Sequence, residues 1–183
     1  MRRSALVLCT VSLLFFFDVH LTKAQAASDA TARQLTITAG GIASAFRSDD
    51  NNDYLIGGGT YVDVRFRHWV QLEAEGRWLN FNQSDGEEES NYLIGPRVPL
   101  WQISKKTELY GKALVGLGRM TFPFGYGYGS FTALAFGGSV DYQATRRLSI
   151  RALDFEYQDW PVWLNNTTLS PYGVSVGVGY RVF

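Results

Sequence analysis

The sequence predicts an all-β fold: an eight-stranded antiparallel up-and-down β-barrel, preceded by a cleavable signal peptide. Apolar and polar residues alternate with period two through most of the chain after residue 33, the pattern of strands with one polar and one apolar face. Most alternating segments are longer than the strands of soluble proteins, which commonly have about 5–6 residues. The connections are alternately short and long, which is typical of barrels with turns at one end and loops at the other.

Composition narrows the class of protein. The chain has 183 residues, enough for one domain, and its 17 basic and 17 acidic residues balance. A nucleic-acid-binding protein carries an excess of basic residues, so no nucleic-acid partner is expected. Charged residues make up 19% of the chain, below the roughly 25% of soluble domains, and the mean hydropathy is -0.09. A wall that is apolar on one face only gives such intermediate values.

Residues 1–26 have the pattern of a secretory signal peptide. Two arginines precede an apolar run of 13 residues, 5–17, and Ala24-Gln25-Ala26 supplies the small residues before a cut after Ala26. The run is shorter than the roughly 20 residues that span a bilayer as a helix. The only cysteine, Cys9, lies in this run, so the exported chain is expected to have neither disulfide nor thiolate metal site. Residues 27–33 are expected to form a loose extension.

The barrel domain, residues 34–183, contains eight alternating segments, each predicted to be a strand. The segments are 34–46, 54–66, 70–81, 91–100, 107–122, 131–143, 148–157 and 172–183. The short turns are 67–69, 101–106 and 144–147, and the long loops are 47–53, 82–90, 123–130 and 158–170. An even number of strands places both termini at the short-turn end, which is the periplasmic end of a membrane barrel.

Glycine indicates which face of each strand lies inside. The polar face holds glycines such as Gly95, Gly116 and Gly177, and a water-facing surface has no steric need of them. The lumen of an eight-stranded barrel is just wide enough for side chains to fill it, so long charged residues there need small neighbours. A lipid-facing Arg or Lys at mid-bilayer costs about 2–4 kcal/mol, so the charged face is predicted to line the lumen of a transmembrane barrel. The predicted interior charge network is Asp63, Arg65, Glu73, Glu75, Arg77, Arg97, Glu108, Lys112, Asp141, Arg151, Asp154, Glu156 and Arg181.

The segment 148–157 breaks the alternation, because Arg151 and Glu156 have opposite parity. A β-bulge near Ala152 and Leu153 would turn both inward. Arg119 has outward parity and is assigned to the outer rim, where the cost of a charge falls toward zero. The five tryptophans lie near turns or loops and are predicted to be interface aromatics at the two bilayer–water boundaries: Trp69, Trp78, Trp101, Trp160 and Trp163.

Four segments, 91–97, 113–118, 148–157 and 177–183, carry a resemblance to a known family. The pattern resembles the small outer-membrane barrels of the OmpA and OmpX type and the broad outer membrane protein beta-barrel domain family. The resemblance implies a location in the outer membrane of a Gram-negative-type bacterium, contact with its lipid and lipopolysaccharide, and assembly by the barrel-assembly machinery. It also implies an assembly signal, here Tyr180 and Phe183. The family usually has an aromatic residue where this chain has Arg181.

The leading hypothesis for function is a non-enzymatic barrel with a charge-plugged interior that supports the envelope or presents its long loops to a partner. A narrow low-conductance pore and a soluble periplasmic ligand-binding barrel are alternatives, and the second would need an apolar interior. A lipid-modifying barrel enzyme is a further alternative. It would need a base at the outer rim, but His20 leaves with the signal peptide and His68 lies in a short turn. No catalytic residue and no cofactor are predicted.

The loop 82–90 contains a predicted metal site made by Asp85, Glu87, Glu88 and Glu89. Hard divalent cations prefer carboxylate oxygens, so these residues are expected to bind such a cation at the lipopolysaccharide surface. The alternative interpretation is an ordinary solvated run of charge.

Overall fold

The computed structural model describes residues 35–48, 54–67, 69–81, 86–121, 127–162 and 167–182. Residues 1–33 lie outside these ranges, so the signal peptide and its cut after Ala26 remain predictions. Within the ranges described, no helix is long and apolar enough to cross a membrane.

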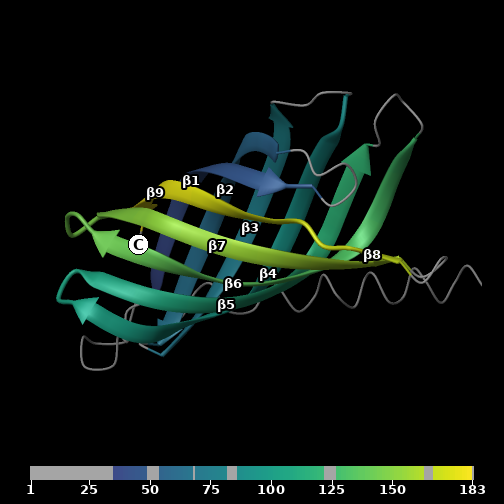
Figure 1. Ribbon diagram of the computed structural model, residues 1–183. Coiled ribbons are helices and arrows are strands. Elements are labelled where there is room, and N and C mark those ends of the chain that lie inside the picture. Colours follow the sequence, from purple (N-terminus) through teal and green to yellow (C-terminus); the bar gives the residue numbers. More distant parts are fainter. Residues whose placement is uncertain are drawn as a thin grey trace, which may run out of the picture. The chain divides into compact units, whose positions relative to one another are not determined.

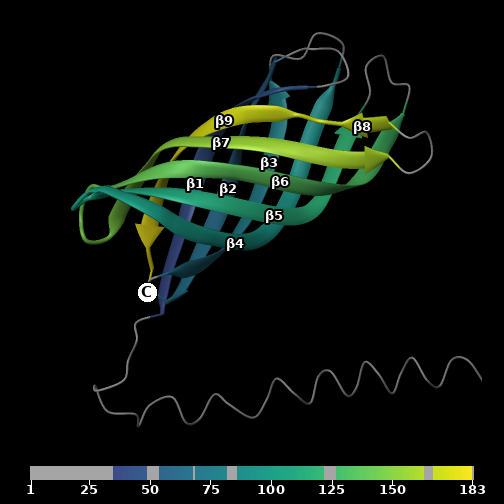
Figure 2. The same ribbon diagram turned by 60° about the horizontal axis from the view of Figure 1, so that its bottom comes forward.

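Eight strands close into one antiparallel barrel, which confirms the predicted fold. Neighbouring strands follow the order β6-β5-β4-β3-β2-β1-β9-β7, and β6 also pairs with β7, so the ring is complete (Figures 1 and 2). A short ninth strand, β8, pairs with the end of β7. The strands are β1 (Thr36–Arg47), β2 (Tyr54–Arg67), β3 (Val70–Phe81), β4 (Glu88–Ser104), β5 (Thr107–Thr121), β6 (Tyr128–Gln143), β7 (Leu148–Val162), β8 (Thr167–Leu169) and β9 (Tyr172–Arg181).

A bulge in β7 confirms the irregularity predicted there. Val140 on β6 pairs with Leu153 and Asp141 pairs with Arg151, so Ala152 is the extra residue. Ala152 and Leu153 are both exposed, and the residues on either side of them are buried. The bulge therefore keeps Arg151 and every second residue from Asp154 onward on the inner face.

Two strands extend furthest beyond the limits that the sequence predicts. β4 runs from Glu88 to Ser104, and the turn after it contains only residues 105 and 106. The register shifts between Pro99 and Trp101 and between Gln102 and Ser104. These shifts interrupt the period of two, so the alternation in the sequence does not mark the end of this strand. β7 continues to Val162, through residues that were expected to form a loop.

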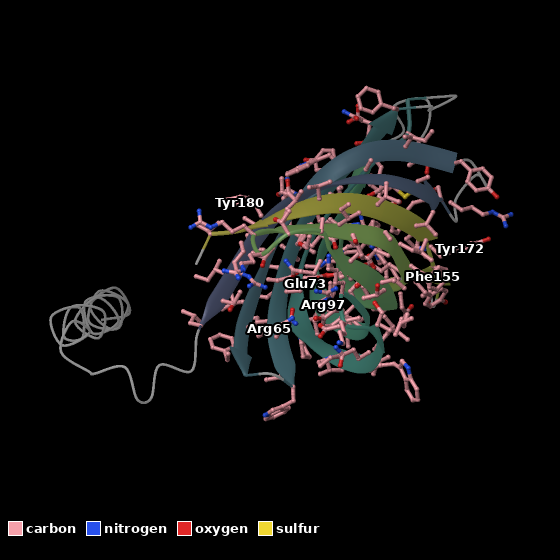
Figure 3. The ribbon with its side chains drawn as sticks, turned by 90° about the vertical axis from the view of Figure 1, so that its left-hand side faces the viewer. Arg65, Glu73, Arg97, Phe155, Tyr172 and Tyr180 are labelled. Carbon is pink, nitrogen blue, oxygen red and sulfur yellow. The ribbon has the colours of Figure 1, made fainter. Side chains whose placement is uncertain are left out.

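Most apolar side chains of the wall face outward, and the ion-paired charged side chains face inward. Outward residues such as Leu117, Phe155 and Val176 are exposed, whereas Glu73 and Arg77 are fully buried. Figure 3 shows Glu73 and Arg97 within the ring of strands, with Phe155, Tyr172 and Tyr180 at its outside. A soluble barrel has the reverse arrangement, since its apolar face is inside. A lipid bilayer would cover this apolar outer surface.

Glycine is required where neighbouring strands approach closely inside the lumen. An added Cβ at Gly116 would overlap the backbone carbonyl oxygen of Tyr92, and one at Gly95 would overlap that of Ala113. A side chain at either position could be accommodated only by moving a strand. These glycines leave room for the long charged side chains beside them.

Candidate functional site

Two arginines, on β4 and β7, share the same carboxylates at the middle of the lumen. Arg97 on β4 donates hydrogen bonds to Asp63 at 3.1 Å and to Asp141 at 2.7 Å. Arg151 on β7 donates to Asp63 at 3.0 Å and to Glu73 at 2.7 Å. Both guanidinium groups are almost fully buried. The pairs therefore join β2 and β3 to β4, β6 and β7 across the lumen.

Lys112 on β5 contacts four carboxylates. Its Nζ lies 3.2 Å from Glu73, 3.3 Å from Glu75, 2.9 Å from Asp154 and 2.8 Å from Glu156. All five side chains are buried, and a buried charge is tolerated only when it is paired and hydrogen-bonded. The ammonium thus neutralises carboxylates from two opposite walls of the barrel, β3 and β7.

Arg77 extends the network toward the long-loop end of the lumen. It donates to Glu156 at 3.0 Å and also pairs with Glu75 on its own strand. Its guanidinium lies over the ring of Phe46, 4.1 Å from the centroid. Arg97 and Arg151 stack in the same way over Tyr110 at 3.8 Å and Tyr61 at 3.9 Å. These rings cover the flat faces of the cations while the carboxylates bind their edges.

Glu73, Glu75 and Asp154 have the donor set of a metal site. One oxygen of each lies within 4.8 Å of the others, and they are the only such group among the described residues. The Lys112 ammonium contacts all three carboxylates. The trio is therefore an ammonium site, because a metal ion would have to displace the lysine.

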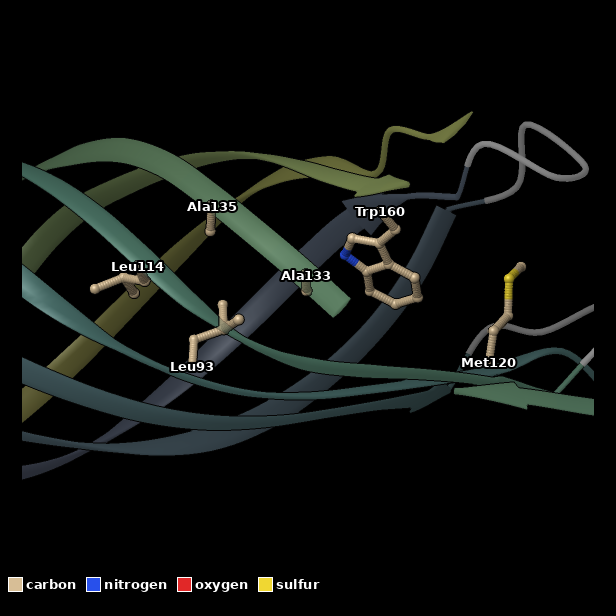
Figure 4. Close-up of a cluster of buried hydrophobic side chains, with 6 residues drawn as sticks. All are labelled: Leu93, Leu114, Met120, Ala133, Ala135 and Trp160. Atoms are coloured by element: carbon tan, nitrogen blue, oxygen red, sulfur yellow. The ribbon is translucent and has the colours of Figure 1, made fainter. Parts of the chain in front are cut away.

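Apolar side chains form a cluster inside the barrel beyond the charge network, toward the long-loop end, and this cluster is called the apolar plug. Leu93, Leu114, Met120, Ala133, Ala135 and Trp160 form one buried cluster (Figure 4). Phe131 and Leu169 are partly buried and pack against it. A second cluster consists of Phe46, Leu55 and Leu79. The described lumen therefore has a network of charged side chains at its middle and, toward the long-loop end, apolar clusters together with the buried Glu87 and Glu89.

Trp160 corrects one of the predicted interface aromatics. It is buried in the plug, where its indole N–H donates to Gln158 at 2.7 Å and its ring stacks on Phe131 with the centroids 5.9 Å apart. The reason is that β7 continues past residue 157, so Trp160 shares the inward parity of Glu156. Counting every second residue onward from Glu156 would have predicted that Trp160 faces inward.

The other aromatic residues that were predicted to lie at the interface or in the assembly signal are exposed wherever the structure describes them. Trp69, Trp78 and Trp101 are exposed on the outer surface or at a turn, and the Trp78 indole donates to the Tyr92 hydroxyl at 3.0 Å. Trp163 lies outside the described residues. Of the predicted assembly signal, Tyr180 is exposed on the outer face and Phe183 also lies outside the described residues.

The structure does not bring the predicted metal ligands together on one surface. Glu87 and Glu89 are buried inside the barrel, and Ser48 donates a hydrogen bond to Glu87. Glu88 lies on the exposed face, because β4 already begins there and neighbouring residues alternate. Asp85 lies outside the described residues. The signal that could have separated these glutamates is the parity that continues backward from Asn91, which is also buried.

A polar cavity opens at the short-turn end. Its volume is about 150 Å³, and the paired side chains of Asp63 and Arg97 are part of its lining. Arg65, Glu108 and Arg181 of the predicted network belong to this cavity rather than to the buried centre. Arg65 donates to the Tyr110 hydroxyl at 2.6 Å and lies 3.6 Å from Glu108. Arg181 donates to Gln143 at 3.4 Å.

The closed ring of long strands, the apolar exterior and the ion-paired lumen define a small transmembrane β-barrel of the outer-membrane type. The chain belongs to the outer membrane protein beta-barrel domain family, whose sequence model matches residues 9–181. No curated protein sequence matches the chain.

Solved structures of small outer-membrane barrels have the same fold. Neisserial surface protein A is 14% identical with a TM-score of 0.60, over 80% of this chain and 96% of that one. The N-terminal barrel of Pseudomonas aeruginosa OprF is 14% identical with a TM-score of 0.51, over 81% and 99%. OprG from Pseudomonas aeruginosa is 13% identical with a TM-score of 0.51, over 80% and 94%. At these identities the likeness concerns the fold alone.

Proposed function

We propose that this chain is a non-enzymatic outer-membrane scaffold whose lumen is closed by its own side chains, and that it supports the envelope or presents surface loops to a partner. One observation carries the proposal. Three cations, Arg97, Lys112 and Arg151, each pair with carboxylates on at least two other strands, so their side chains cross the lumen. The apolar plug adds a second barrier beyond these pairs. A solute or hydrated ion would have to break both to pass.

Conductance tests the closed lumen. The full mature chain, refolded and inserted into a planar lipid bilayer, is expected to give no discrete current steps. Lys112→Ala combined with Trp160→Ala removes the ammonium that neutralises four carboxylates and the largest side chain of the apolar plug, and we expect this double variant alone to give small cation-selective steps. Insertion of both proteins is checked by their different gel migration with and without heating. Current steps of similar size in the unmodified protein would instead support the narrow-pore alternative.

The proposed surface role rests on the four long connections, which a barrel of this class directs away from the periplasm. The sequences concerned are 47–53, 82–90, 123–130 and 158–170. A short epitope inserted after residue 84 is expected to be detected by antibody on intact cells, whereas the same epitope after Lys105 is expected to require permeabilised cells. The reverse result would contradict this orientation. Contact with lipopolysaccharide, export through the signal peptide and recognition of Tyr180 and Phe183 by the assembly machinery are parts of the same proposal.

A further inference from the structure

The cavity at the short-turn end has a charge distribution that the buried network does not explain. Its volume of about 150 Å³ equals roughly five water molecules at about 30 Å³ each. Hydroxyl and amide groups line part of it, and charged side chains surround them. The basic members are Arg65, Arg97, Lys105, Lys106 and Arg181, and the acidic members are Asp63, Glu108 and Asp141.

Each carboxylate of this cavity is already paired with a guanidinium. Asp63 and Asp141 both accept hydrogen bonds from Arg97. Glu108 lies 3.6 Å from Arg65 and accepts a hydrogen bond from the Tyr110 hydroxyl. A bound cation would therefore have to compete with an arginine for every acidic ligand.

Three bases of the cavity form no ion pair with any carboxylate in the described part of the chain. They are Lys105 and Lys106, in the turn between β4 and β5, and Arg181, at the end of β9. The Nε of Arg181 is buried and has no hydrogen-bond acceptor among the described residues. The charge left over in the cavity is thus positive.

A cavity with walls of low dielectric constant concentrates the field of such charges, so a small anion is the ligand that fits. A guanidinium fork suits a carboxylate or a phosphate. The cavity lies inside the ring of strands, because its lining comes from the inner faces of all eight strands of the barrel as well as from the turn. Lipid phosphates surround the outside of that ring, so a ligand that arrives through water at the open end is favoured.

We propose that the short-turn mouth of the barrel binds the terminal carboxylate of a peptide. Arg181 and the Lys105–Lys106 turn hold the carboxylate, and the Thr38 hydroxyl on the same lining bonds to the adjoining peptide group. Gln143 and Ser149 also line the cavity, but their side chains already bond to groups of the barrel itself, so they report on the ligand without holding it. The site is independent of whether the lumen conducts.

The probe is N-acetyl-alanyl-alanine, and its C-terminal amide is the matched neutral compound. The full mature chain in detergent micelles is titrated with each, and chemical shifts of the Thr38, Gln143 and Ser149 amides are followed by NMR. We expect saturable shifts with the acid, with a Kd on the order of 1 mM, and none with the amide. Equal shifts with both compounds would overturn the proposal.

Two variants locate the site. Arg181→Gln combined with Lys105→Gln and Lys106→Gln is expected to weaken acid binding at least tenfold, the effect of losing about one charge-assisted hydrogen bond. Arg146→Gln with Arg147→Gln removes two charges from the turn between β6 and β7, which does not line the cavity, and is expected to change Kd less than twofold. Heat-dependent gel migration verifies that both variants fold. Equal weakening in the two would show a diffuse charge effect and contradict the proposal.

Two further measurements test whether inorganic phosphate or a lipid headgroup occupies the site instead of a carboxylate. Phosphate that displaces the acid at equal or lower concentration would reject the assignment to a carboxylate. Shifts of the same three amides on transfer from neutral to phosphatidylglycerol-containing nanodiscs, without any added peptide, would assign the site to a lipid headgroup instead. The proposal expects neither.

Discussion

Arg151→Met tests how much the ion-paired lumen contributes to stability. The guanidinium donates to Asp63, Glu73 and Asp154 over 2.7 to 3.1 Å and is fully buried. Removing one partner of a buried pair costs about 3–5 kcal/mol, because the remaining charge stays buried. Arg97 still contacts Asp63, and Lys112 still contacts the other two carboxylates, so the lower end of this range applies. We expect a loss of about 3 kcal/mol, or roughly a hundredfold in the folding equilibrium.

The assay is reversible urea unfolding in lipid vesicles, followed by tryptophan fluorescence and by gel migration. Arg146→Met removes the same side-chain type from an exposed turn and should change the free energy of unfolding by less than about 0.5 kcal/mol. The double variant Arg151→Met with Glu73→Gln should lose less than the sum of the single losses, since the charge left uncompensated is then removed. A loss below about 1 kcal/mol for Arg151→Met would refute the view that these pairs stabilise the barrel.

Three further changes have clear expected outcomes. Gly116→Val should prevent folding, seen as the absence of a heat-modifiable band, because its side chain would overlap the β4 backbone, whereas outward-facing Gly41→Ala, whose Cβ would meet nothing closer than 3.8 Å, should fold. Trp160→Ala should lower the free energy of unfolding by about 3–5 kcal/mol in the same urea assay, because it empties the centre of the apolar plug. Deletion of Ala152 should yield a folded barrel, since it removes the bulge and keeps the inner face intact, whereas deletion of Phe155 should not, because it turns every later inward residue of β7 toward lipid. Folding of the Phe155 deletion together with failure of the Ala152 deletion would contradict the register described.

Most of the fold could be read from the sequence because a strand has only two faces. The alternation along β9, with Val174, Val176 and Val178 on one side, settles which residues share a face. The glycines opposite them indicate which face lies inside. Even the bulge in β7 could be predicted, because Arg151 and Glu156 have opposite parity and both carry charges that lipid would reject.

The details of the lumen could not be predicted in the same way. Arg151 and Asp63 are 88 residues apart, and only closure of the barrel brings them within 3.0 Å. The positions of Trp160 and Glu89 depend on where β7 ends and β4 begins, and polar residues or bulges near the strand ends obscure those limits. Part of the apolar plug was missed for the same reason, since Trp160 lies in the segment 158–170 that was expected to form a loop.

The central claim is that the apolar face of each strand contacts lipid while the other face fills a narrow lumen. Methyl-labelled protein in micelles tests it by magnetisation transfer from the acyl-chain protons of the detergent. We predict strong transfer to the methyl groups of Val115 and Val176, which are exposed on the outer wall, and none to those of Leu114, which are buried inside. Transfer to Leu114, with Val115 and Val176 contacting water instead, would contradict the account.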